Sequence, residues 1–133
     1  MALIVLLVLL ALGVIALQKG TVNIAIVAKN AGFTGTDLIT AVAVALAESS
    51  GNAMAYNPND PGGSYGLWQI DLGLHPEFQG ENLYDPQTNA NAAYSVWQRQ
   101  GWEGWSTYKN GNYKLHLPVA AAAVGGADLG VSV

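Results

Sequence analysis

The sequence predicts a mainly α-helical domain with a minimal β-turn region, preceded by a hydrophobic helix. Three observations support this fold class. Apolar residues recur at helical spacing in three segments, turn-forming residues gather between the second and third, and the first twenty residues are almost entirely apolar. A chain of 133 residues suits one domain, with enough length left after the first twenty to bury a core. We expect a hydrophobic anchor helix at residues 1–20, the domain at residues 21–126 and a flexible tail at residues 127–133.

Composition excludes several classes of function. The net charge is −4 and only five residues are Lys or Arg, whereas binding to nucleic acid requires a basic surface. The chain has no cysteine, so it can form neither a disulfide framework nor a thiolate zinc site. Its two histidines, His75 and His116, lack the spacing of metal ligands. We therefore predict no nucleic-acid partner, no metal and no cofactor.

Residues 2–17 are sixteen consecutive apolar or glycine residues. As a helix this segment would be about 24 Å long, short of a hydrocarbon core of roughly 30 Å. Three readings stay open: a span of a locally thinned membrane, a signal peptide, or a helix buried in a larger assembly. An uncleaved anchor is favoured, because no Lys or Arg precedes the segment and no Ala-x-Ala site follows it. However, Lys19 and Lys29 follow it, which by the positive-inside rule would leave the domain in the cytoplasm.

Two helices are predicted next. Residues 21–32 form the first, which ends at Gly32 and whose apolar face consists of Ile24, Val27, Ala28 and Ala31. Residues 36–47 form the second, with Thr36 as the expected N-cap and Gly51 as the stop. We expect the buried face of this second helix to consist of Ile39, Val42, Ala43 and Leu46.

Glu48 follows in the last turn of the second helix, within Ala-Leu-Ala-Glu-Ser-Ser-Gly-Asn. The C-terminal carbonyls of a helix repel a carboxylate, and partial burial also favours the protonated acid. An acid that stays neutral near neutral pH is what a general acid needs in order to protonate a glycosidic oxygen. On helix position alone, a surface glutamate that merely ends a helix is the more frequent case.

A loop rich in turn-forming residues follows at residues 52–63, and Tyr56 and Tyr65 flank it. Aromatic and amide side chains beside an acid suit carbohydrate binding, although for Tyr56 a packing role is equally compatible. The loop leads into a short apolar run that carries Trp68 and Gln69. We expect the minimal β-turn region at residues 64–71.

The segment 86–100 has clear helix boundaries. Asp85 is a suitable N-cap, Pro86 suits the first helical position, and Gly101 follows the end. Its inward stripe is expected to consist of Ala90, Ala93, Tyr94 and Trp97.

Two tryptophans and an alanine-rich segment complete the expected core. Trp102 and Trp105 lie three residues apart, which favours packing in the core over stacking on a sugar. Residues 117–126 are expected to form a closing helix, with Pro118 at its start.

Glu48-Ser49 followed by Gly66-Leu67-Trp68-Gln69-Ile70 resembles the paired motif of the lytic transglycosylase and goose-type lysozyme superfamily. It is particularly similar to the soluble-lytic-transglycosylase domain of phage tail and virion proteins. The similarity runs from about residue 23 to residue 125, and the spacing of two motifs makes it specific. Residues 107–111 resemble the family's Ala-Tyr-Asn motif less closely, since the Tyr is kept and the Asn moves one place. The resemblance implies a lysozyme-like fold, Glu48 as the single catalytic acid/base, and a saccharide cleft formed by Ser49, Tyr65, Gly66, Leu67, Trp68, Gln69, Tyr108 and Asn110.

The resemblance implies an enzyme that cleaves the MurNAc-GlcNAc β-1,4 bond of peptidoglycan and leaves a 1,6-anhydro sugar. Glycosidases ordinarily use two carboxylates, and Asp60 and Asp71 lie near enough in sequence to be candidates for the second. An intramolecular attack by the muramyl C6 hydroxyl needs only one carboxylate. A goose-type hydrolase that uses Asp60 or Asp71 to position water is the alternative enzyme. A non-catalytic structural virion protein with a lysozyme-like fold is the alternative outside enzymes.

The expected partners are peptidoglycan glycan strands and, through residues 2–17, a membrane or a virion assembly. The expected location is a phage virion, in its tail or associated with a membrane, acting at the bacterial cell wall or periplasm. Carriage in a virion also weakens the topological conflict raised by Lys19 and Lys29.

Overall fold

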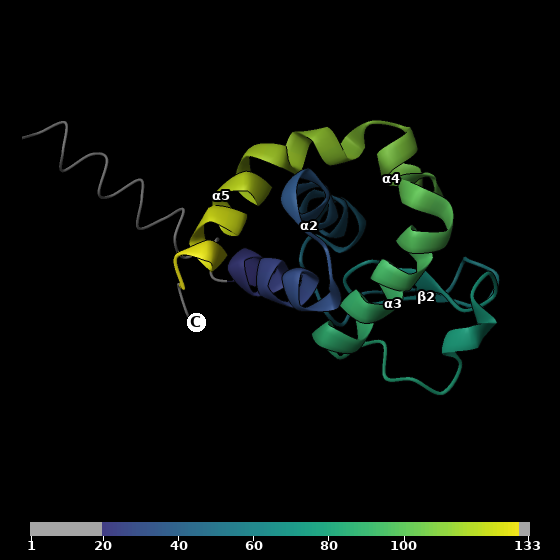
Figure 1. Ribbon diagram of the computed structural model, residues 1–133. Helices are drawn as coiled ribbons and strands as arrows, with labels where there is room; N and C mark the ends of the chain where they lie inside the picture. Colours follow the sequence, from purple (N-terminus) through teal and green to yellow (C-terminus); the bar gives the residue numbers. More distant parts are fainter. Residues whose placement is uncertain (1–19, 131–133) are drawn as a thin grey trace, which may run out of the picture.

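One buried helix forms the centre of the molecule. The computed structural model describes residues 20–130. Helix α2 (Gly35–Ser49) lies at the centre of the fold in space, and the other helices form a ring around it (Figure 1). Each of the five residues from Ala41 to Ala45 is 0% exposed. Between Leu38 and Ala47 the only polar side chain is Thr40, and a helix that is apolar on nearly every side is stable only when it is surrounded.

The ring consists of helices and short 3-10 turns. Residues 20–31 are helical and are followed by a turn at Gly32. The remaining elements of the ring are α3 (Pro86–Gln100), η2 (Gly101–Gly104), α4 (Ser106–Lys109), η3 (Asn112–His116) and α5 (Leu117–Asp128). The mainly α-helical fold class is therefore confirmed.

A three-stranded antiparallel sheet and a 3-10 turn lie at one side of the ring. The strands are β1 (Tyr56–Asn57), β2 (Ser64–Tyr65) and β3 (Ile70–Asp71), and η1 (Pro76–Phe78) follows them. Tyr56 pairs with Tyr65, and Ser64 pairs with Asp71. The sheet is small, as predicted, but its first strand lies within the segment 52–63 that composition assigns to a loop.

The boundaries and buried face of α2 differ from the prediction. The N-cap is Thr34, whose extended backbone accepts a hydrogen bond from the Leu38 N–H, so Thr36 lies inside the helix. The C-cap is Ser50 in the left-handed conformation, one residue before the predicted Gly51. Because the helix is surrounded, its buried residues do not follow one face, and the predicted Ile39 and Leu46 are only partly buried.

The predicted caps of α3 and the predicted core tryptophans are confirmed, whereas the last helix is longer than predicted. Asp85 caps α3 by accepting a hydrogen bond from the Thr88 N–H, and Gly101 is its C-cap, both as predicted. Trp102 and Trp105 are 8% and 5% exposed, which confirms their place in the core. Helix α5 continues through two glycines to Asp128, beyond the predicted domain end at residue 126, and the Asp128 carboxylate accepts a hydrogen bond from Lys29.

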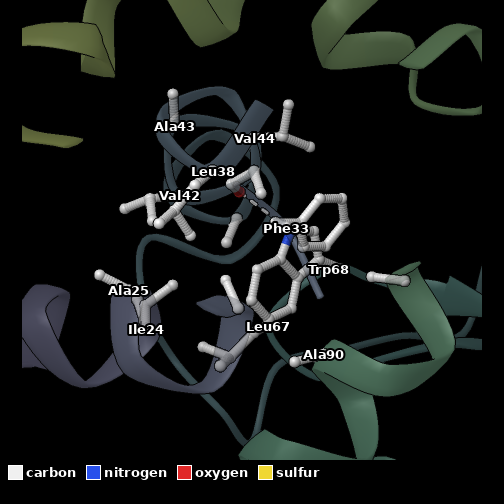
Figure 2. Close-up of a cluster of buried hydrophobic side chains, with 14 of the residues drawn as sticks. Ile24, Ala25, Phe33, Leu38, Val42, Ala43, Val44, Leu67, Trp68 and Ala90 are labelled. Atoms are coloured by element: carbon white, nitrogen blue, oxygen red, sulfur yellow. Dashed lines mark hydrogen bonds between the residues drawn. The ribbon is translucent and has the colours of Figure 1, made fainter. Parts of the chain in front are cut away.

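Trp68 connects three parts of the fold. Its ring is 0% exposed and lies among apolar side chains of α2, α3 and the first helix (Figure 2). The Trp68 indole N–H donates to the Ala41 carbonyl at 2.9 Å, and the Trp68 carbonyl accepts from the Trp105 indole at 2.9 Å. The central helix, the segment after β2 and the segment before α4 are therefore held in register by buried hydrogen bonds.

Asn89 holds the same segment from the side of α3. This fully buried side chain accepts a hydrogen bond from the Trp68 N–H and donates to the carbonyls of Tyr65 and Leu83, each at 2.8 Å. Gly66 lies directly against it with φ +78°, and a Cβ atom there would collide with the Asn89 amide. Glycine is therefore required at this position.

The predicted hydrophobic helix at residues 2–17 lies outside the described residues. Within residues 20–130, no helix combines the length and the apolar character needed to cross a membrane.

We expect Asn89→Ala to lower the free energy of unfolding by roughly 3 kcal/mol or more, because it leaves buried backbone groups of three residues without a partner. Asn91→Ala is the matched control, since Asn91 is an exposed asparagine on the same helix, and it should cost less than about 0.5 kcal/mol. Urea unfolding of both variants measures the difference, and equal values would contradict this role of Asn89.

Candidate active site

Glu48 lies in the last turn of α2, where the buried helix reaches a pocket. The pocket has a volume of about 230 Å³ and lies between the end of α2, the sheet and the η2–α4 segment. Its lining residues are Glu48, Asp60, Ser64, Gln69, Ile70, Asp71, Leu74, His75, Val96, Gly104, Trp105, Ser106 and Lys109. The Glu48 side chain is half-buried, so it is withdrawn from bulk water but open to this pocket.

Thr107 is the direct partner of Glu48. Its hydroxyl donates to Glu48 Oε2 at 2.6 Å, a length typical of a hydroxyl bonded to a carboxylate. Burial raises the pKa of Glu48 above its ordinary value, and the negative charge of Asp60 adds to this. The hydrogen bonds from the Thr107 side chain and backbone lower the pKa, but burial is the larger effect, so the pKa is raised overall.

The two aspartates of the pocket differ in what holds them. Asp71 Oδ1 accepts hydrogen bonds from the backbone N–H groups of Gly62, Gly73 and Leu74, at 3.4, 2.8 and 3.3 Å. This carboxylate therefore fixes the loop around β3. Asp60 Oδ2 accepts from the Ser64 hydroxyl at 2.5 Å and from the Asn57 amide at 3.4 Å, and its charge reaches Glu48.

Gln69 is the residue of the predicted cleft segment that reaches the pocket. Its backbone has φ +49°, an uncommon conformation for a residue other than glycine. The side-chain amide N–H₂ donates to the carbonyls of Ala55 and Gly66 at 3.1 and 3.0 Å. These bonds fix the amide beside the pocket and leave its carbonyl oxygen as an acceptor.

The neighbours of Gln69 form the wall behind it. Leu67 and Trp68 are buried in the core, and Gly66 packs on Asn89. The Ser49 hydroxyl donates to the Ala45 carbonyl at 2.8 Å, within its own helix. These predicted site residues therefore pack in the core or within α2, where they support the segments that carry Glu48 and Gln69.

Three further predicted residues are sequence neighbours of pocket-lining residues but do not line the pocket themselves: Tyr65, Tyr108 and Asn110. Tyr65 packs against the rings of Tyr56 and Tyr84, at centroid distances of 5.0 and 5.7 Å. Tyr108 stacks on Tyr113 at 4.6 Å. The Asn110 side-chain oxygen accepts from the Asn112 N–H, which stabilises a turn. Their predicted contact with a glycan stays a prediction.

Sequence reasoning did not identify Thr107, His75, Ser106 and Lys109 as residues at the site. Thr107 directly precedes Tyr108, so the similarity to the Ala-Tyr-Asn motif indicated the right segment, and within it Thr107 is the residue bonded to Glu48. Trp105 was expected in the core, where it lies, and it also lines the pocket.

The fold and site together define a class of protein: a small helical domain that presents one half-buried carboxyl group, with a raised pKa, to a polar pocket. Comparison with known families agrees with this class. A family described as "Lysozyme like domain" matches residues 25–107, which is more than half of the chain. The chain therefore belongs to the lysozyme-like domain family, and this membership supports the expected action on peptidoglycan. Searches of curated proteins and of solved structures gave no match.

The raised pKa of Glu48 predicts how stability depends on pH. The folded protein holds the Glu48 proton to a higher pH than the unfolded chain, so its contribution to stability is lost as pH rises above the ordinary value of 4.5. Glu48→Gln cannot ionise, and we expect it to be more stable than the wild type at neutral pH.

The advantage of Glu48→Gln should shrink when unfolding is measured by urea below pH 4.5, where both side chains are neutral. Glu81→Gln removes an exposed carboxyl outside the pocket lining and should show no such trend. A Glu48→Gln variant that is less stable than the wild type at neutral pH would refute the burial argument.

Proposed function

We propose that this chain is a lytic transglycosylase that cleaves the β-1,4 bond between MurNAc and GlcNAc in peptidoglycan. The observation that carries the proposal is the position of Glu48: half-buried, with a raised pKa, in a pocket shared with Gln69 and bonded to Thr107. A proton donor with a raised pKa suits protonation of a glycosidic oxygen. The sequence resemblance supplies the substrate and the anhydro product.

The reaction proceeds in two proton transfers at the same carboxyl group. Neutral Glu48 gives its proton to the glycosidic oxygen, the bond from this oxygen to muramyl C1 breaks, and positive charge develops at C1. The Glu48 carboxylate then removes the proton of the muramyl C6 hydroxyl while O6 bonds to C1. The ring closes to a 1,6-anhydro sugar, Glu48 regains its proton, and no water is consumed. Because the nucleophile belongs to the same sugar, the entropic cost of bringing it to C1 is small.

The other polar groups of the pocket have roles in this scheme. The carboxylates of Asp60 and Asp71 line the pocket, where negative charge stabilises the positive charge that develops at C1. The Gln69 amide, which is fixed by two backbone carbonyls, presents its oxygen to a sugar hydroxyl or acetamido N–H.

Hydrolysis is the second candidate, and one observation favours it. Asp60 lines the same pocket as Glu48 and acts on its pKa, so it is near enough to orient a water molecule towards C1. Asp71 suits this role less well, because three backbone N–H groups already engage its Oδ1.

For the place of action we propose the bacterial cell wall, reached from a phage virion. This proposal rests on the sequence resemblance alone, with residues 2–17 as the attachment to a membrane or a virion assembly.

Digestion of purified sacculi tests the proposed activity. The wild type should release muropeptides, whereas Glu48→Gln should be slower by at least about 10²-fold, because a glutamine amide cannot act as the acid. Mass spectrometry of the products separates the two candidate reactions, since a transglycosylase leaves 1,6-anhydro ends and a hydrolase leaves reducing ends.

Glu81→Gln serves as the control, because this carboxyl is exposed and outside the pocket lining, and it should digest sacculi like the wild type. No release by the folded wild type would refute both enzymatic functions and favour a structural role for the lysozyme-like fold.

A further inference from the structure

Thr107 touches the proposed acid, and nothing in the reaction scheme above gives it a role. We infer that the Thr107 hydroxyl is the positioning group of Glu48: it holds Oε2, so that Oε1 is the oxygen that exchanges protons with the glycan. The inference rests on the proposed function, because it assigns the two oxygens of the same carboxyl group.

The direction of the hydrogen bond distinguishes the two oxygens of Glu48. The hydroxyl lies 2.6 Å from Oε2, and a carboxylate can only accept, so the hydroxyl donates in the ionised state. If the hydroxyl keeps this direction when Glu48 is protonated, the acidic proton is favoured on Oε1, because the carbonyl oxygen of a carboxylic acid accepts a hydrogen bond better than its hydroxyl oxygen does. One fixed donor therefore selects the same working oxygen for both transfers, in which Glu48 acts first as acid and then as base.

Buried hydrogen bonds fix the position of Thr107. Two residues earlier, the buried Trp105 indole donates to the Trp68 carbonyl, and Trp68 donates in turn to the Ala41 carbonyl of α2. Glu48 belongs to this same helix. The donor and the carboxyl group are thus two ends of one hydrogen-bonded framework, so their separation is fixed before any substrate binds.

The neighbouring Tyr108 packs against other aromatic rings. Tyr108 stacks on Tyr113 and packs on Trp102, at centroid distances of 4.6 and 6.2 Å. Burial raises the pKa of Tyr108, and the neighbouring Tyr113 adds to this. Ser106, Thr107 and Tyr108 are three consecutive residues with hydroxyl groups, and Thr107 is the one bonded to the acid.

The charged groups around Glu48 set the background for a pH test. Asp60, Asp71, His75 and Lys109 line the same pocket. All four remain when Thr107 alone is changed, so a change in pH dependence then reports the lost hydroxyl.

Thr107→Val removes the hydroxyl at constant shape, and Thr107→Ser keeps it. We expect Thr107→Val to lower kcat on sacculi about tenfold, because the carboxyl group loses its fixed position. The hydrogen bond lowers the pKa of Glu48, so its loss raises this pKa and shifts the alkaline limb of the pH–rate profile to higher pH. Thr107→Ser should keep the wild-type profile. Thr36→Val is the control, an exposed threonine at the other end of α2.

A second readout needs no activity. Thr107→Val should make the free energy of unfolding fall more steeply as pH rises above 4.5, whereas Thr107→Ser should keep the wild-type slope. This comparison tests the hydrogen bond between Thr107 and Glu48 even if the wild type fails to digest sacculi, an outcome that refutes the proposed function and with it the role of Oε1 towards the glycan. Thr107→Ala, also without the hydroxyl, replaces Thr107→Val should that variant not fold. Equal behaviour of the valine and serine variants in rate and slope, whether both impaired or both normal, would overturn the inference.

Discussion

The fold depends on the burial of the middle of α2 on all sides. Its middle is built from alanine and valine, whose small side chains let the surrounding helices approach closely, and the stretch from Ala41 to Ala45 is 0% exposed. The only charged residues of this helix are Asp37 near its start and Glu48 near its end. Asp37 lies where the helix dipole favours negative charge and accepts a hydrogen bond from Trp102, whereas Glu48 lies where the dipole opposes it. Burial of the helix therefore fixes where the unfavourable carboxyl group emerges.

The geometry of the pocket depends on this helix. One buried hydrogen bond joins Trp68 to α2, and a second joins Trp105 to Trp68. The core therefore fixes the segments that contain Gln69 and Thr107 relative to Glu48. Thr107 is 59 positions from Glu48 in sequence, yet their side chains meet at 2.6 Å. A site held on buried elements keeps its geometry without a ligand, which is the arrangement a general acid needs.

Local signals made much of this fold predictable from the sequence, whereas long-range contacts were not. The boundaries of α3 follow from Asp85 and Gly101, because capping is decided within a few residues. The burial of α2 on all sides was missed, since an amphipathic pattern presumes a solvent face. The position of Glu48 in the last turn of that helix could be predicted from the local sequence. Its partner Thr107 could not, because contacts between residues far apart in sequence, such as the bond from Trp105 to Trp68, bring α4 to the end of α2.

The central claim is that burial keeps the carboxyl group of Glu48 protonated above the pH at which a glutamate ordinarily ionises. Carboxyl-carbon NMR of the full chain, with ¹³C-labelled glutamate and Glu48→Gln to assign the resonance, measures this most directly. The account predicts a titration midpoint above 4.5 for Glu48. A midpoint at or below 4.5 would show that its hydrogen bonds outweigh its burial, and Glu48 would then not be the proton donor described here.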